Sequence, residues 1–273
     1  MYTIRDLRKY QYDYHKENFP FAFNFIKNPY SFLKARFYME SSAVFVWFLL
    51  KTNIKPNTVT IIYGIAGIIT GILLSIPNYY TVIIALFIAF TKGILDWSDG
   101  HLARLKYEPS LTGQILDEYG ASLNSIGLII GLGFFAMHQS GYELLIYVIP
   151  ILPFLHGEKF TSFGKNIILN NMDSLLIKDD DRVKFENHKI KNKKSSKYPS
   201  VLMRFSGFFD DRARSVDFIL LIIVIDIYYD TNATLYILLL ILLRLCIQFV
   251  FSFVYGVKFK WAEGIVASLN RRQ

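Results

Sequence analysis

Three aspartates lie close together in residues 96–121, whose sequence is DWSDGHLARLKYEPSLTGQILDEYGA. Because an α-helix advances about 100° per residue, the first two of them share one face with two small residues. These four residues are Asp96, Asp99, Gly100 and Ala103. Asp117 follows Gly113 by one turn, and the connection 105–112 is short enough to bring two helix ends together. The spacing therefore predicts that three carboxylates converge at one site.

Converging carboxylates indicate a binding site for a hard metal ion. An ionised aspartate in a membrane-spanning helix costs about 2.5–3.5 kcal/mol. Three neighbouring carboxylates also repel one another, so they need protons or a cation. Ligand sets made only of oxygen favour Mg²⁺ or Mn²⁺. The alternative is that the aspartates face cytoplasmic water at helix ends. Their position beside glycine and alanine, and not beside lysine, favours the metal site.

Arg104 indicates which class of ligand this site would bind. It stands directly after the acidic residues and carries a permanent positive charge. A pyrophosphate would neutralise the metal and the arginine together, and the group attached to it could reach into lipid or cytosol. Metal ions act on such substrates by orienting them and by stabilising the departing phosphate oxygen. The residues thus favour chemistry at a pyrophosphate.

The aspartates lie among apolar runs that are long enough to cross a bilayer. The chain has 273 residues, of which 53% are apolar. A run of about 20 apolar residues spans the hydrocarbon core of a membrane. The candidate spans are residues 58–76, 80–94, 116–137, 144–160, 216–229 and 235–255. This pattern predicts an all-α integral membrane protein with a bundle of six transmembrane helices.

The placement of basic residues predicts the orientation of these spans. The connections 77–79, 138–143 and 230–234 contain no Lys or Arg, whereas the alternate connections are basic. By the positive-inside rule, six spans then place both termini in the cytoplasm. This topology and the attraction to anionic membrane lipids explain the net charge of +8, so the charge does not indicate binding to nucleic acid. The single cysteine, Cys246, excludes an intrachain disulfide.

The organisation of the chain follows from the same pattern. Residues 1–28 are aromatic and charged, which predicts a cytoplasmic N-terminal extension. Residues 29–256 are expected to form an interfacial amphipathic helix, over 29–50, followed by the six-helix domain. Within that domain 171–215 is a basic cytoplasmic loop, and residues 257–273 form a cytoplasmic tail.

Two glycine pairs have the spacing that lets membrane helices approach closely. They are Gly67 with Gly71 and Gly127 with Gly131. Small residues four apart allow the backbones of two helices to touch. We expect these pairs to pack helices within the bundle, and formation of a homodimer is the alternative.

The acidic segment resembles the signature of the CDP-alcohol phosphotransferases, an integral-membrane family. The family pattern is DxxDGxxAR, a short spacer and GxxxDxxxD. This sequence matches it at Asp96, Asp99, Gly100, Ala103, Arg104, Gly113 and Asp117. The resemblance covers residues 29–255 and implies six spans with cytoplasmic termini. It also implies transfer of a phosphate-linked group from a CDP-alcohol, with CDP-diacylglycerol favoured, to a hydroxyl acceptor with release of CMP, in phospholipid biosynthesis.

The resemblance further implies which residues bind ligands. The three aspartates would hold two Mg²⁺ or Mn²⁺ ions. The residues implied to bind the CDP-linked donor are Gly100, Ala103, Arg104, Ser110, Gly113, Asn57 and Thr60. For Asn57, a second interpretation is that it caps the first spanning helix.

One position departs from the family pattern. Its last aspartate falls at Ala121, where the resemblance implies a metal ligand and the base that deprotonates the acceptor hydroxyl. Alanine can serve neither role. His101 titrates in the right range, although we expect it to face headgroups, and Asn124 shares the face of position 121 but is no base. Three interpretations remain: a transferase that uses another base or an acceptor that needs little deprotonation, an impaired member that binds metal and donor, and a cation transporter.

Overall fold

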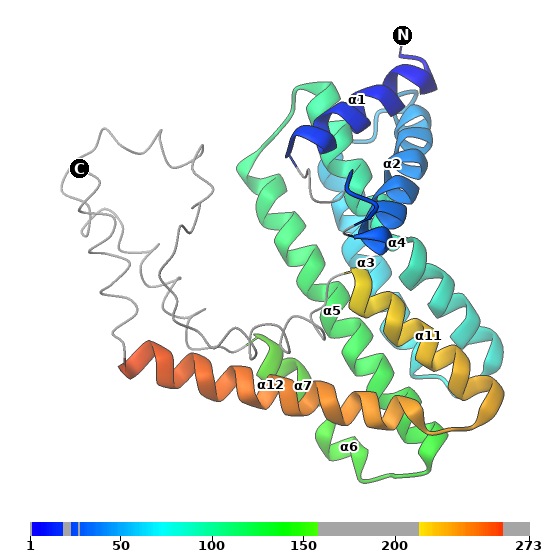
Figure 1. Cartoon of the computed structure of the whole chain (residues 1–273), viewed down its shortest axis with the longest axis vertical. Coiled ribbons are helices and arrows are strands. Elements are labelled where there is room, and N and C mark those ends of the chain that lie inside the picture. The colour runs from blue at the N-terminus through cyan, green and yellow to red at the C-terminus, as the bar shows by residue number, and fades with distance from the viewer. Residues whose placement is uncertain (1, 19–22, 27, 158–212, 259–273) are drawn as a thin grey trace. The chain divides into compact units, whose positions relative to one another are not determined.

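The computed structural model describes residues 2–18, 23–26, 28–157 and 213–258 (Figure 1). The described residues form helices and no strand, which confirms the all-α class. The helices are α1 (Ile4–Asn18), α2 (Pro29–Leu49), α3 (Pro56–Leu74), α4 (Tyr79–Lys106), α5 (Leu111–Ser140), α6 (Leu145–Val148), α7 (Ile151–Gly157), α11 (Ala213–Tyr229) and α12 (Ala233–Lys258).

Four of the described helices are long and apolar enough to cross a membrane, so the chain is a membrane protein. They cover Pro56–Leu74, Tyr79–Lys106, Thr112–Ser140 and Ala233–Val254. The predicted span 144–160 corresponds to two short helices, α6 and α7, and part of it lies outside the described residues. The predicted span 216–229 corresponds to α11, which has 17 residues. The count of six spans, the interfacial place of α2 and the cytoplasmic termini stay predictions.

Local capping residues set the two helix ends that carry the acidic segment. α4 begins after Asn78, whose side chain accepts a hydrogen bond from the Tyr80 backbone N–H at 2.9 Å. It ends at Lys106, and the next residue, Tyr107, has a left-handed backbone with φ of 55°. α5 begins after Ser110, whose hydroxyl oxygen accepts from the Gly113 backbone N–H at 3.0 Å. Side-chain oxygens at these positions satisfy helix N–H groups that have no partner within the helix.

The chain divides into two compact units, of which the first contains the acidic segment. That unit comprises Met1–Pro150 and Asp211–Leu238. The second comprises Ile151–Asp210 and Leu239–Gln273, and in it the rings of Phe154 and Phe249 lie 5.9 Å apart. The predicted basic loop and C-terminal tail lie almost wholly outside the described residues.

α3 packs along both α4 and α5, and its contact with α5 is made through glycines. A Cβ atom added to Gly71 would lie 2.5 Å from the Gly127 carbonyl oxygen, and one added to Gly131 would lie 2.9 Å from the Gly71 Cα. The two predicted glycine pairs therefore face each other within the chain. Their use in bundle packing is confirmed, whereas homodimer formation stays untested.

The N-terminal extension contains a helix that docks on the bundle. α1 packs against α2, and its Leu7 side chain is fully buried among apolar residues of α2, α3 and α4. These residues are Ala43, Val46, Leu49, Val59, Leu102 and Leu105. Burial of a leucine side chain stabilises by about 1.5–3 kcal/mol, so this contact anchors α1.

Candidate active site

The folding of α4 and α5 brings two of the three aspartates into contact. Asp96 and Asp99 lie in the last third of α4, and Asp117 lies in the second turn of α5. The carboxyl groups of Asp96 and Asp117 lie within hydrogen-bonding reach of each other, and such a bond needs a proton on one of them. Asp96 is half-buried and Asp117 is exposed. The short connection between the helices thus places carboxylates from both helix ends at one point.

Asp99 is buried and is held by its own partners. Its Oδ2 accepts a hydrogen bond from the Thr60 hydroxyl at 2.7 Å, and its Oδ1 accepts from the Gly100 backbone N–H at 2.5 Å. Thr60 comes from the first turns of α3, so this bond ties α3 to the acidic end of α4. Thr60, which the sequence placed among donor-binding residues, here orients a carboxylate.

Tyr63 is a residue of the site that the sequence analysis missed. It is buried on α3, and its phenol lies within electrostatic range of all three aspartates. Gly120 makes room for its ring, because a Cβ there would lie 3.0 Å from Tyr63 Cδ1. The sequence feature that could have identified Tyr63 is its position one turn after Thr60 on the same helix.

The fit of a metal ion to these residues rests on the Asp96–Asp117 pair. Two carboxyl groups in contact need a proton or a cation between them. Their oxygen donors suit a hard divalent ion. However, among the described residues no group of three or more His, Cys, Asp or Glu side chains is gathered closely enough to hold a metal. Asp99 is turned toward Thr60 and the Gly100 N–H.

Arg104 lies one turn beyond Gly100 on α4 and is held by residues of α1. Its Nη2 donates a hydrogen bond to Gln11 Oε1 at 3.2 Å, and its Cζ lies 3.8 Å from the centroid of the Tyr14 ring. A Cβ atom at Gly100 would lie 3.2 Å from Arg104 Nη1. The glycine therefore gives the guanidinium room beside the helix, while α1 covers one of its faces.

The remaining predicted donor-binding residues gather at the start of α5. A Cβ atom at Gly113 would lie 3.1 Å from both Asn57 Oδ1 and Ser110 Oγ. Asn57 is not the helix cap that one interpretation expected, because the N-cap of α3 is Lys55 and Asn57 lies inside the first turn. Ala103 is half-buried on α4.

The two residues considered as replacements for the missing aspartate, His101 and Asn124, are both placed differently from a side chain at position 121. His101 is fully buried, and its ring stacks on Tyr10 with the centroids 5.7 Å apart. The expectation that it faces headgroups is therefore wrong, because the aromatic ring of α1 covers it. Neither of its nitrogens has a hydrogen-bond partner in the described part of the chain. Asn124 Nδ2 donates to the carbonyls of Tyr63 and Gly120, both at 2.9 Å, so it packs α5 on α3.

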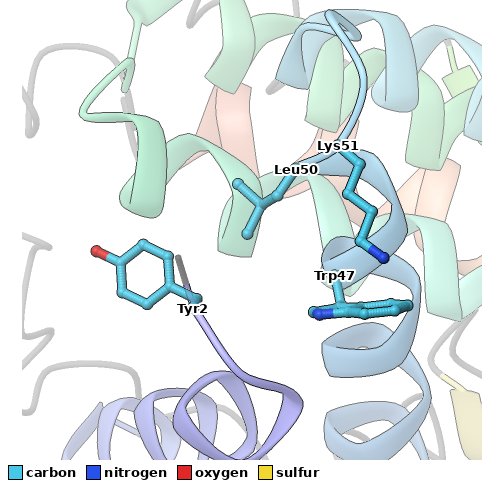
Figure 2. Close-up of a pocket in the computed structure, with 4 residues that line it drawn as sticks. All are labelled: Tyr2, Trp47, Leu50 and Lys51. Atoms are coloured by element: carbon cyan, nitrogen blue, oxygen red, sulfur yellow. The ribbon is translucent and has the colours of Figure 1, made fainter.

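A pocket of about 170 Å³ lies elsewhere, between the start of the chain and the end of α2 (Figure 2). It is lined by Tyr2, Trp47, Leu50 and Lys51, and the Lys51 Nζ lies 3.1 Å from the centroid of the Trp47 ring. No residue of the acidic segment lines it.

Comparison with known proteins finds a family match for the helices that carry this site. Residues 53–153 match the family model described as CDP-alcohol phosphatidyltransferase. Over this segment the chain is similar to the CDP-alcohol phosphatidyltransferase family. The recognition of the motif is thereby confirmed, and the family implies transfer of a phosphate-linked group from a CDP-alcohol. Such phosphatidyltransferases generally depend on a divalent metal. No curated protein matches the chain. The helices α1 and α2 lie outside the matched segment.

Proposed function

We propose that the chain transfers the phosphate-linked group of CDP-diacylglycerol to a hydroxyl acceptor and releases CMP, as a step of phospholipid biosynthesis. The observation that carries this proposal is the contact, inside the matched domain, between Asp117 of α5 and Asp96, which lies on the same helix as Arg104. Carboxylates that take a cation and an arginine that takes phosphate are then placed on adjoining helix ends.

A lipid-linked donor is supported by the surfaces of the helices that carry the site. The outer sides of α3 and α4 expose large apolar side chains, among them Ile61, Ile65, Ile68, Ile83 and Phe87. In a membrane, these surfaces contact acyl chains. A donor with diacyl chains can therefore approach the acidic end of α4 from the bilayer, while its nucleotide stays in the polar region.

The metal would be held by Asp96, Asp99 and Asp117, with Mg²⁺ or Mn²⁺ as the ions that suit oxygen ligands. When bound, the metal supplies positive charge for the pyrophosphate and stabilises the departing phosphate oxygen. Thr60 holds the carboxylate of Asp99 in one orientation through its 2.7 Å hydrogen bond.

The donor would be bound by Arg104 and by the small or polar residues around it, namely Gly100, Ala103, Ser110, Gly113, Asn57 and Thr60. Arg104 offers planar N–H donors that suit phosphate oxygens. The absence of side chains at Gly100 and Gly113 leaves room for donor-binding groups of the chain itself, because an added Cβ atom would lie 3.2 Å from Arg104 Nη1 at Gly100 and 3.1 Å from Asn57 Oδ1 and Ser110 Oγ at Gly113.

Ala121 favours a second function, that of a family member which binds metal and donor but turns over slowly. Position 121 lies one turn after Asp117 and offers no base. His101 is covered by Tyr10, and Asn124 is a neutral amide whose Nδ2 donates to the carbonyls of Tyr63 and Gly120. Neither replacement candidate therefore supplies a free base in this arrangement.

Purified protein in lipid nanodiscs, supplied with CDP-diacylglycerol and Mg²⁺, decides between these functions. Acceptors to compare are glycerol phosphate, inositol phosphate and serine, with CMP release as the readout. CMP release that depends on one acceptor supports the transferase. Donor binding without CMP release supports the impaired member. Absence of donor binding contradicts both.

A further inference from the structure

The guanidinium of Arg104 is held from outside the matched domain, by the N-terminal helix α1. This helix is anchored by Leu7, which is fully buried against α2, α3 and α4. One turn later Gln11 is also fully buried, although burial of an amide is costly unless it finds hydrogen-bond partners. The inward side of α1 therefore carries a polar group at the level of the acidic segment.

The hydrogen bonds of Gln11 define which way its amide points. Its Nε2 donates to Ser42 Oγ at 3.1 Å and to the carbonyl oxygen of Trp97 at 3.5 Å. The Ser42 hydroxyl donates its own proton to the Met39 carbonyl at 3.2 Å, so its oxygen acts as the acceptor for Gln11. A carbonyl oxygen can only accept. The amide oxygen must therefore face the other way, toward Arg104 Nη2.

Two tyrosines of α1 complete the contact with the guanidinium. The Tyr14 ring lies against its face, an arrangement in which the ring attracts the cation. The Tyr10 side chain is also within hydrogen-bonding reach of Arg104. The Arg104 Nε has no hydrogen-bond partner among the residues that the structure describes. The helix thus immobilises the arginine.

We propose that Gln11 is a positioning residue, which fixes Arg104 for the pyrophosphate of the CDP-linked donor. This inference rests on the proposed function, because that function assigns Arg104 to the donor. A mobile arginine gives up rotamer freedom when it binds phosphate, and one already held by Gln11 and Tyr14 loses less. Gln11 acts only through Arg104, since both ends of its amide are occupied by protein groups.

The test is the dissociation constant of CDP-diacylglycerol, measured on the full chain in nanodiscs with Mg²⁺. Gln11→Leu removes the hydrogen bond to a charged group, and we expect it to raise the dissociation constant about tenfold. The matched control is Lys9→Gln, because Lys9 is exposed on the same helix, and its dissociation constant should equal that of the wild type. An unchanged or tighter affinity of Gln11→Leu overturns the inference, and a tighter one would mean that α1 withholds Arg104.

A double-mutant comparison separates positioning from general support of the fold. In an Arg104→Met background, Gln11→Leu should cause no further loss of affinity, because the group it positions is gone. An equal loss in both backgrounds would mean that Gln11 is merely structural.

Two further outcomes are distinguishable. If Gln11→Leu does not fold, Ser42→Ala takes its place, since it removes the hydroxyl that orients the amide, and we expect about a threefold weaker affinity. Wild-type affinity in that variant would overturn the inference. If the wild type itself binds no CDP-diacylglycerol, the proposed function is wrong and the inference falls with it. If the wild type and Gln11→Leu bind CDP-diacylglycerol with equal affinity, the inference about Gln11 is contradicted and the proposed function is not.

Discussion

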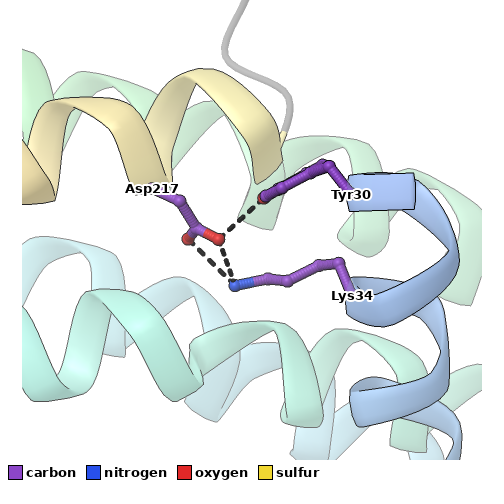
Figure 3. Close-up of polar contacts among 3 residues, drawn as sticks. All are labelled: Tyr30, Lys34 and Asp217. Carbon is purple, nitrogen blue, oxygen red and sulfur yellow. Dashed lines mark hydrogen bonds and ion pairs between the residues drawn. The ribbon is translucent and has the colours of Figure 1, made fainter. Parts of the chain in front are cut away.

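Lys34 of α2 forms a buried ion pair with Asp217 of α11, in which Nζ lies 2.6 Å from Oδ2 (Figure 3). The Tyr30 hydroxyl donates to the same carboxylate oxygen at 2.7 Å. The Lys34 Nζ also lies 4.0 Å from the centroid of the Phe90 ring on α4. One side chain therefore joins three helices, and it connects the helix before the matched domain with a helix that follows it.

Removal of one partner of this pair should destabilise the fold more than removal of both. Asp217→Asn leaves the Lys34 charge buried without a counter-ion, and loss of a buried partner costs about 3–5 kcal/mol. The double variant Lys34→Met with Asp217→Leu should regain much of that stability. Thermal unfolding in detergent measures both. Equal melting temperatures for the wild type and Asp217→Asn would show that the pair contributes nothing.

Gly71 should tolerate no side chain where α3 meets α5. In Gly71→Ala the new Cβ would lie 2.5 Å from the Gly127 carbonyl oxygen, so the helices would have to separate. Overpacking of this kind typically costs about 1–3 kcal/mol. Gly157→Ala is the control, because an added Cβ there meets nothing within 4 Å. A melting temperature for Gly71→Ala that matches the control would contradict the close packing.

The elements that carry the site could be predicted from the sequence, because their signals are local. Apolar runs and the polar residues Asn78 and Ser110 mark the ends of α4 and α5. The glycine spacing indicated a close helix contact without naming the partner helix. The motif placed its carboxylates on facing helix ends, and the structure joins Asp96 to Asp117.

The role of α1 could not be predicted in this way. Gln11 and Arg104 are 93 positions apart, and periodicity does not say which distant helices meet. A weak signal existed in the spacing of Leu7, Gln11 and Tyr14, which fall on one helix face. The burial of His101 depends on the same helix, since the Tyr10 ring that covers it belongs to α1. The prediction from the sequence that His101 faces the lipid headgroups was therefore wrong.

Loss of either carboxylate of the contacting pair should weaken metal-dependent donor binding. Asp96→Asn and Asp117→Asn each replace a charged oxygen ligand by a neutral amide, which binds Mg²⁺ poorly. We expect the affinity for CDP-diacylglycerol in the presence of Mg²⁺ to fall at least about tenfold in each variant. Glu118→Gln, the exposed neighbour of Asp117, is the control. Unchanged metal dependence in both aspartate variants would place the metal elsewhere.

The docking of α1 should depend on pH through His15. Its ring stacks on Trp97 with the centroids 4.2 Å apart, and burial, followed by the charge of Arg104, lowers its pKa to about 4. The ordinary histidine pKa is about 6.5. Because the folded pKa is the lower one, docked α1 keeps its full stability above pH 6.5 and loses it as the pH falls toward 4.

Amide hydrogen exchange of α1, corrected for intrinsic rates, measures this effect. Protection should fall between pH 7 and pH 5 in the wild type. His15→Phe keeps an aromatic ring against Trp97 and removes the titrating group, so its protection should not change over that range. A wild-type protection that is equally flat would contradict the assignment of the pH dependence to His15.

Restoring a carboxylate at position 121 should increase turnover. On α5, position 121 lies one turn after Asp117 and shares its face, so an aspartate there would add a metal ligand and a base. General-base catalysis typically contributes about 10²–10⁴ in rate. We expect Ala121→Asp to raise CMP release at least about tenfold at saturating Mg²⁺, with little change in donor affinity. Ser122→Asp, which adds the same charge about 100° away around the helix, is the control. A flat or lower rate in Ala121→Asp would mean that the chain already uses another base and that extra negative charge crowds a complete site.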